Sequence, residues 1–220
     1  MNELLATEQN RTLTTPRRRY GFLARLLFLT MDLVYGRRRS LAKFEVLELI
    51  ARVPYQAWES VAYAGITHTH ACPAFARRIF DFVQEARAQQ DNEQWHLLIL
   101  EEQVARRGAR YGLVRRRVVP QLIALFYYHV SWLLYVIEPR LSYALNADFE
   151  DHAEHEYMHF VAEHPELDRE PFVSAFESDY GRFESLGDAL RRIGLDEREH
   201  KDESLAHIAA PRFGLRRLDA

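Results

Sequence analysis

The sequence predicts an all-α protein built around a four-helix bundle. Glycine and proline are scarce, with 9 and 8 among 220 residues, and they fall at natural breaks between segments. Apolar residues recur at intervals of three and four, which is the helical period. Glu-x-x-His occurs at Glu93–His96 and again at Glu197–His200, about a hundred residues later. A ferritin-like bundle binds two metal ions through two such pairs and one Glu from each of two other helices.

The length of 220 residues predicts a single domain, and the composition is ordinary. The chain is 48% hydrophobic and 28% charged with a net charge of −3, which argues against a dedicated nucleic-acid binder. Cys72 is the only cysteine, so neither a disulfide framework nor a cysteine zinc site is available. The first sixteen residues lack the apolar core of a secretory signal. We expect a flexible segment over residues 1–19, a catalytic domain over 20–210 and a tail over 211–220.

Six helices follow from the periodicity and from the positions of the breaks. Gly36, Pro73, Gly108 to Gly112, Pro139 and Pro165 to Pro171 separate them. The expected helices cover about 20–35, 40–65, 75–106, 118–137, 140–164 and 175–208.

The chain divides into two halves of similar layout, in which a lone Glu precedes each Glu-x-x-His helix. Glu48 stands 45 residues before Glu93, and Glu150 stands 47 residues before Glu197. Two antiparallel helices joined by a loop would bring each lone Glu level with its pair. Glu48 and the pair Glu93–His96 lie among aliphatic residues, where a charged group must be paired or metal-bound.

Two apolar segments suggest contact with a membrane. Residues 118–137 carry no formal charge and are long enough to span a bilayer. We favour a helix lying in the membrane interface, with Phe126 on one face and Trp132 on the other. The segment 20–35 contains Arg25 and Asp32, which suits an interfacial helix better than a span. Arginine triplets occur at residues 17–19, 37–39 and 115–117. Those that precede the apolar segments would suit anionic lipid headgroups. Two buried core helices, or one true span at 118–137, are the alternatives.

A rival motif lies at His155–His159, which reads H-E-x-x-H, the zinc metalloprotease signature. It predicts zinc bound by His155 and His159 with Glu156 activating water. The pattern is short and lies in a stretch rich in His and Glu, so it is weakly specific.

Several ordered motifs resemble the alternative oxidase family, specifically its plastid terminal oxidase branch. The resemblance covers roughly residues 26 to 205. Its motifs are Val46-Leu47-Glu48-Leu49-Ile50-Ala51-Arg52-Val53-Pro54-Tyr55, Asn92-Glu93-Gln94-Trp95-His96-Leu97-Leu98-Ile99-Leu100-Glu101-Glu102, Ile123-Ala124-Leu125-Phe126-Tyr127-Tyr128, Pro139-Arg140-Leu141-Ser142-Tyr143, Phe149-Glu150-Asp151-His152-Ala153 with Tyr157, and Asp196-Glu197-Arg198-Glu199-His200.

The resemblance implies a monotopic, usually homodimeric membrane enzyme that oxidises quinol and reduces O₂ to water at two iron ions. Such an oxidase is cyanide-resistant and pumps no protons. The implied iron ligands are Glu48, Glu93, His96, Glu150, Glu197 and His200. Four glutamates would neutralise two ferrous ions. Tyr157 matches a redox-active tyrosine, and Asn92 and Asp196 match residues that hold the imidazoles. The quinol pocket would involve Lys43, Leu47, Ala153 and Glu156.

Two positions depart from the family pattern. Position 43 is Lys where Arg is typical, and position 156 is Glu where Thr is usual. Both lie near the expected quinol headgroup, so the choice between ubiquinol and plastoquinol stays open. We expect the quinol to enter its pocket from the bilayer, between the segments 20–35 and 118–137. No transit peptide is evident, which favours the cytoplasmic face of a bacterial inner membrane, with a thylakoid-type membrane as the alternative. A di-iron hydroxylase or iron-binding protein would share the ligands and lack lipid-facing helices.

Overall fold

The computed structural model describes residues 2–69, 71–108 and 111–209, and this part of the chain is helical throughout apart from loops and one isolated bridge between Pro171 and Ser185. The helices are α1 Glu3–Thr14, α2 Phe22–Tyr35, α3 Leu41–Ala51, α4 Val53–Thr69, α5 Pro73–Arg107, α6 Val119–Ile137, α7 Pro139–Glu163 and α8 Leu186–Ala209, with a π-helical turn η1 at Val114–Val118 and a 3₁₀ turn η2 at Pro165–Asp168. The predicted fold class, an all-α four-helix bundle, is confirmed.

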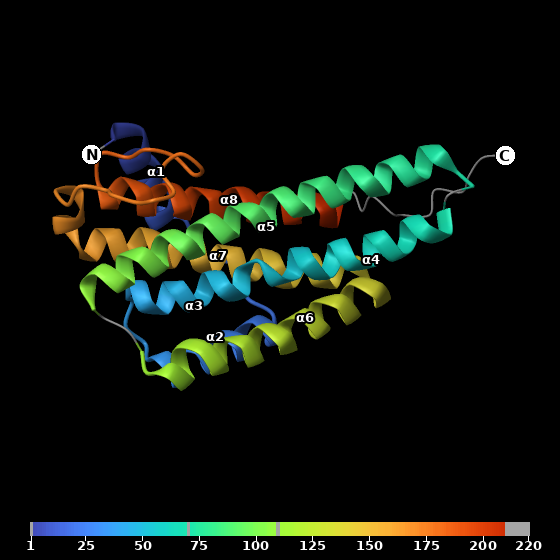
Figure 1. Cartoon of the computed structure of the whole chain (residues 1–220), viewed down its shortest axis with the longest axis horizontal. Helices are drawn as coiled ribbons and strands as arrows, with labels where there is room; N and C mark the ends of the chain where they lie inside the picture. Colours follow the sequence, from blue (N-terminus) through green and yellow to red (C-terminus); the bar gives the residue numbers. More distant parts are fainter. Residues whose placement is uncertain (1, 70, 109–110, 210–220) are drawn as a thin grey trace.

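Two packed pairs form the bundle, and they correspond to the two halves of the sequence (Figure 1). In the first pair, α3 and α4 follow one another along α5, and in the second pair α7 lies against α8. The helix expected over 40–65 is divided, because α3 ends at Ala51 and α4 starts at Val53. Pro54 has no backbone N–H to donate to the preceding turn, which is tolerated only near a helix start.

Helix α8 begins later than expected. The prediction of a helix from residue 175 is wrong, because residues 169–185 form turns and extended chain and the helix starts at Leu186. Ser185 caps this start, since its Oγ accepts a hydrogen bond of 3.1 Å from the Asp188 N–H. Gly181 has a φ of +144°, a conformation that interrupts any helix. Phe172 in this segment is buried in the core with Leu190.

The N-terminal segment, for which flexibility is expected over residues 1–19, contains helix α1. Helix α1 packs on α7 and α8. Gln9 donates a 2.8 Å hydrogen bond to the Met158 carbonyl, and Thr12 donates one of 2.6 Å to Glu154 Oε1. Arg198 of α8 pairs with Glu8 and Glu154. These partners are distant in sequence, so no local sequence pattern predicts the packing of α1 on α7 and α8.

Gly194 allows α8 to approach α7 closely beside the bundle centre. A Cβ at this position would lie 3.2 Å from Tyr157 Cβ and 3.0 Å from Met158 Cε. Such contacts are tighter than ordinary van der Waals packing, so a larger residue would push the two helices apart. The absence of a side chain at Gly194 therefore permits the close packing of α8 next to Tyr157.

Helices α2 and α6 lie along one edge of the bundle, at the bottom of Figure 1. Both expose large apolar side chains, which on α2 are Phe22, Leu26, Leu29 and Leu33 and on α6 are Leu122, Leu125, Phe126, Trp132, Leu133, Val136 and Ile137. In the described part of the chain, Val114–Ile137 is the one helical segment long and apolar enough to cross a membrane. The exposed face of α6 differs from the expected split, because Phe126 and Trp132 are both exposed while Tyr127 and Tyr135 are buried.

Only some arginines of the three triplets are available to bind lipid headgroups. Arg17 and Arg39 pair with Glu156 at 2.7 and 3.1 Å, and Arg116 pairs with Glu45 at 3.0 Å. At least one arginine of each triplet therefore forms an ion pair within the protein. Arg37 and Arg38 remain exposed.

Candidate metal centre

The six predicted ligands converge at the centre of the bundle. Their helices are α3 for Glu48, α5 for Glu93 and His96, α7 for Glu150, and α8 for Glu197 and His200. In each Glu-x-x-His pair, the three-residue spacing places both side chains on one helix face. Five of the six are 0% exposed and His200 is 6% exposed. Ligand atoms of Glu48, Glu93, His96 and Glu197 lie within 4.8 Å of one another, as do those of Glu93, Glu150, Glu197 and His200.

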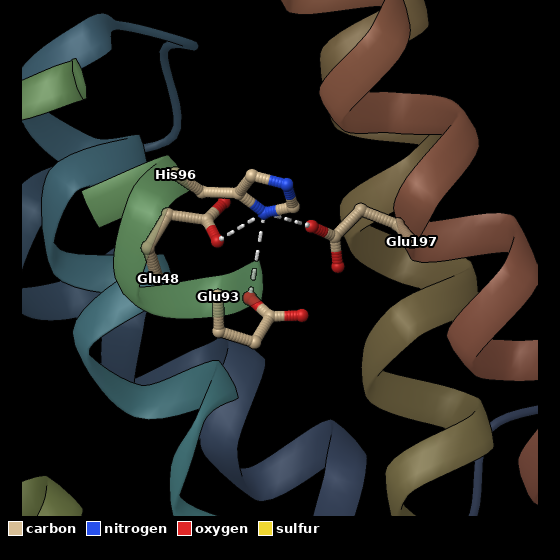
Figure 2. A group of neighbouring side chains, drawn as sticks. All are labelled: Glu48, Glu93, His96 and Glu197. Atoms are coloured by element: carbon tan, nitrogen blue, oxygen red, sulfur yellow. Dashed lines mark ion pairs between the residues drawn. The ribbon is translucent and has the colours of Figure 1, made fainter. Parts of the chain in front are cut away.

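In the first group, His96 faces carboxylates from three helices (Figure 2). Its Nδ1 atom lies 3.4 Å from Glu48 Oε2, 3.6 Å from Glu93 Oε2 and 3.2 Å from Glu197 Oε1. The other ring nitrogen, Nε2, lies 3.1 Å from Asp196 Oδ2. One nitrogen therefore points into the group and the other is held from outside it, which is the usual arrangement of a metal-binding histidine.

In the second group, His200 faces the shared carboxylate of Glu93. Its Nδ1 atom lies 2.7 Å from Glu93 Oε1. Tyr55 of α4 donates a 2.7 Å hydrogen bond to Glu150 Oε1. Glu93 and Glu197 belong to both groups, so they lie between two adjacent positions for a cation. Each position would then have one terminal carboxylate, one imidazole and two shared carboxylates.

Unpartnered buried atoms show that the residues fit a metal pair. Eight atoms of the six side chains are buried without a hydrogen-bond partner: Glu48 Oε2, Glu93 Oε1 and Oε2, His96 Nδ1, Glu150 Oε2, Glu197 Oε1 and Oε2, and His200 Nδ1. Such groups are costly to bury unless something binds them. Two imidazole nitrogens with carboxylate oxygens are a donor set that suits iron.

Burial and mutual repulsion raise the pKa values of three of the carboxylates. Burial, with the Glu93 charge nearby, raises the pKa of Glu48 to about 8. The same causes, burial and then Glu93, raise the pKa of Glu150 to about 7. The pKa of Glu197 is also raised well above its ordinary value by burial and by its neighbours Glu93 and Glu48. The metal-free site therefore holds protons where divalent ions would otherwise balance the charge.

The supporting residues lie partly where the sequence placed them. Asp196 contacts His96, and Asp196 Oδ2 in turn accepts a 2.5 Å hydrogen bond from Tyr180. Tyr157 donates to Glu48 Oε1. Asn92 makes no hydrogen bond to either imidazole among the described residues, and its Oδ1 is buried without a partner. No sequence pattern indicated a role for Tyr55 or Tyr180, and Tyr180 lies in the segment wrongly assigned to a helix.

The rival zinc motif is not assembled. His155 has Nδ1 at 2.7 Å from the Asp151 carbonyl and Nε2 at 3.0 Å from the Thr15 carbonyl. His159 belongs to none of the metal-compatible groups found in the described residues. A third acidic group, Asp151, Glu154 and His155, is paired with Lys201 at 3.6 and 2.5 Å from its two carboxylates.

The four predicted quinol-pocket residues lie on α3 and α7, between α2 and the metal centre. Lys43 is buried, and its Nζ contacts Asp32 Oδ1 at 2.7 Å and the Gly36 carbonyl at 2.9 Å. Leu47 and Ala153 belong to the buried apolar cluster that also packs α2 and α6. Glu156 forms ion pairs with Arg17 and Arg39.

A sequence model of the alternative oxidase family matches residues 10–207 of this chain. The chain belongs to this family. The match includes all six residues of the metal centre and both helices of the apolar edge, and it confirms the family predicted from the motifs.

One curated relative is ubiquinol oxidase 4, chloroplastic/chromoplastic, of Arabidopsis thaliana. The two sequences are 36% identical over 140 residues, which is 64% of this chain and 36% of the relative. The aligned region thus spans little more than a third of that protein. The likeness agrees with the plastid-type branch of the alternative oxidase family.

Proposed function

We propose that this protein is a membrane-associated quinol oxidase that reduces O₂ to water at two iron ions. The observation that carries the proposal is the buried pair of Glu/His groups sharing Glu93 and Glu197, in a chain of the alternative oxidase family. The relative from Arabidopsis thaliana is a ubiquinol oxidase, which supports a quinol as reductant.

The residues of the centre would divide between the two ions. Glu48 and His96 would hold one ion, Glu150 and His200 the other, and Glu93 and Glu197 would bind both. When bound, an iron pair supplies the electron transfer by which O₂ is reduced. The full burial of the carboxylates keeps bulk water away from the reacting atoms.

Tyr157 is placed to hold a proton at the centre. Its hydroxyl donates to Glu48 Oε1, and both side chains are fully buried. Burial, together with the Glu48 charge, raises the pKa of Tyr157 well above its ordinary value. The phenol therefore stays protonated at neutral pH. This is the state required of a group that gives up an electron and a proton together, the role implied by the family resemblance.

An apolar groove between α2 and α6 supports entry of a lipid-soluble substrate. It has a volume of about 320 Å³ and is lined by Leu23, Leu26, Leu27, Thr30, Val119, Leu122, Ile123, Phe126, Tyr127, Val130 and Leu145. Tyr127 stacks on Phe149 with ring centroids 5.9 Å apart, and Phe149 precedes Glu150 in α7. The four predicted pocket residues do not line this groove, so we assign it to the quinol tail and them to the headgroup.

The same two helices support association with a membrane. Their exposed leucines and aromatic residues form an apolar edge, and soluble monomers rarely expose contiguous apolar surface of large extent. A di-iron hydroxylase or iron-binding protein would have no need of this edge. We propose a monotopic, homodimeric arrangement, on the cytoplasmic face of a bacterial inner membrane or on a thylakoid-type membrane, with cyanide-resistant turnover that pumps no protons.

Oxygen uptake by membranes containing the recombinant protein tests the function. Ubiquinol and plastoquinol are supplied separately, with and without cyanide. We expect quinol-dependent uptake that persists in cyanide, and its loss in Glu93→Ala, because the shared carboxylate cannot be replaced. Circular dichroism should show unchanged helicity in this variant.

A surface variant of the same helix serves as the control. Glu101→Gln removes a half-exposed carboxylate that pairs with Arg116 at 2.8 Å, outside the centre. It should leave uptake unchanged. Undiminished uptake in Glu93→Ala would refute the assignment. Two bound irons without quinol-dependent uptake would favour the hydroxylase or iron-binding alternative.

A further inference from the structure

Two tyrosines contact the metal centre in a crosswise arrangement. Tyr157 of α7 donates to Glu48 of α3, and Tyr55 of α4 donates to Glu150 of α7 at 2.7 Å. Each tyrosine follows the lone Glu of its own half by seven residues, since Tyr55 follows Glu48 and Tyr157 follows Glu150. In the second half both residues lie on α7, two helical turns apart on one face, whereas in the first half Glu48 lies on α3 and Tyr55 on α4. The two halves thus exchange the same hydrogen bond.

The Tyr55 hydroxyl is fixed by a second hydrogen bond. Asn146 Nδ2 donates to the Tyr55 oxygen at 3.0 Å and to Ser204 Oγ at 3.1 Å. All these side chains are buried, with Tyr55 and Asn146 both 0% exposed. A tyrosine that already accepts from Asn146 has one proton to donate, and that proton goes to Glu150. The Tyr55 ring also lies edge-on to His200, with centroids 5.7 Å apart.

The two hydrogen bonds select one oxygen of each terminal carboxylate. Oε1 of Glu150 accepts from Tyr55, and Oε2 has no hydrogen-bond partner. Glu48 shows the same division, with Oε1 bonded to Tyr157 and Oε2 lying 3.4 Å from His96 Nδ1. In both halves the unpartnered oxygen is the one available to a cation.

We propose that Tyr55 is a positioning residue of the metal centre, which holds Glu150 through Oε1 and leaves Oε2 for the metal ion beside His200. The proposal rests on the proposed function only in taking the centre to bind metal. Tyr55 and Tyr157 then differ in what supports them. Among the described residues Tyr157 has no hydrogen bond besides that to Glu48, whereas Tyr55 is anchored through Asn146 to Ser204 on α8.

Anaerobic titration of the metal-free full chain with Co²⁺, followed by its visible absorption, tests the proposal. Wild type should bind two equivalents. Tyr55→Phe should weaken one equivalent by about 10–100-fold, the usual effect of losing a group that orients a metal ligand, and leave the other unchanged. The phenyl ring keeps the packing against Trp58 and His200.

A double-mutant comparison identifies which ion is affected. Adding Tyr55→Phe to Glu150→Gln should change binding little further, because the hydrogen bond acts through Glu150. Adding Tyr55→Phe to Glu48→Gln should weaken the ion beside His200 by the same factor as in the single variant, since Tyr55 and Glu48 serve different ions. Tyr20→Phe is the control, because Tyr20 donates a similar 3.0 Å hydrogen bond to Asp151, outside the centre.

The outcomes separate this inference from the function. If wild type binds two equivalents and Tyr55→Phe binds both as tightly, the positioning role is refuted while the centre stands. If wild type binds no pair of ions, the proposed function itself fails. Should Tyr55→Phe not fold, Asn146→Ala removes the anchor of the hydroxyl and should weaken the same equivalent; unchanged binding in that variant would equally refute the role.

Discussion

The two halves of the bundle contribute the same ligands but support them differently. The ion position beside Glu48 and His96 is backed by Tyr157 and Asp196, both from the second half. The position beside Glu150 and His200 is backed by Tyr55 of the first half. Each half therefore holds the other half's ligands, and neither pair of helices could build a complete ion site alone.

The groups that hydrogen-bond to the ligands of the two ions also differ in charge. Asp196 is a carboxylate that contacts Tyr180 and Arg192 as well as His96. Hydrogen bonding to His96, then the nearby charges, hold the Asp196 pKa below its ordinary value despite burial. The support of Glu150 is a neutral chain from Tyr55 through Asn146 to Ser204. We infer that the two ions have unequal affinities.

The largest effect should come from the shared carboxylates. Glu197→Gln removes a ligand of both ions and should weaken both equivalents by more than about 100-fold, whereas Glu150→Gln should weaken one. Metal content per chain after gel filtration measures both variants. Arg198, the neighbour of Glu197, pairs with Glu8 and Glu154, so Arg198→Lys offers a control in the same turn of α8. One equivalent kept at wild-type affinity in Glu197→Gln would contradict the sharing.

A smaller and one-sided effect is expected from Asp196→Asn. The amide keeps the shape of the side chain but removes the charge that holds His96 Nε2. Affinity should fall by about 10–100-fold for the ion beside His96 and remain unchanged for the other. Co²⁺ titration of Asp196→Asn measures both ions. The same titration in a Glu150→Gln background measures the ion beside His96 alone. Equal weakening of both ions would mean that Asp196 supports the bundle as a whole and not one ligand.

The mildest prediction concerns pH and the metal-free protein. Glu48 and Glu150 have pKa values raised to about 8 and about 7 by burial and by Glu93. The folded state then binds more protons than the unfolded state between pH 5 and 8, so its stability is present at low pH and is lost as the pH rises. Unfolding by urea should show a loss of at least about 1 kcal/mol across this range.

The metal-loaded protein should show the opposite trend. Metal binding needs deprotonated carboxylates and neutral imidazoles, so its stabilising effect grows with pH. The difference in unfolding free energy between loaded and metal-free protein should therefore widen from pH 5 to pH 8. A metal-free protein whose stability rose over the same interval would show that these carboxylates are not held protonated in the fold.

Local sequence patterns predicted the helices, and together with the family resemblance they predicted the candidate ligands. The three-residue spacing of Glu93 and His96 fixes a common helix face whatever surrounds it, and charged residues among aliphatics marked Glu48 as buried. The helix boundaries were less certain. Pro54 divides the helix expected over 40–65, and Ser185 and Gly181 start α8 eleven residues later than expected, at Leu186 instead of residue 175. These are local signals that the periodicity of the flanking residues obscured.

What the sequence determined by itself is the helical class of the fold and the pairing of Glu and His on common helix faces, because both depend on neighbours three or four positions away. Tertiary structure alone decided that α1 docks on α7 and α8, that Arg17 and Arg39 turn inward to Glu156, and that Tyr55 reaches Glu150. Each of these contacts joins residues more than ninety positions apart, and their meeting depends on how whole helices pack.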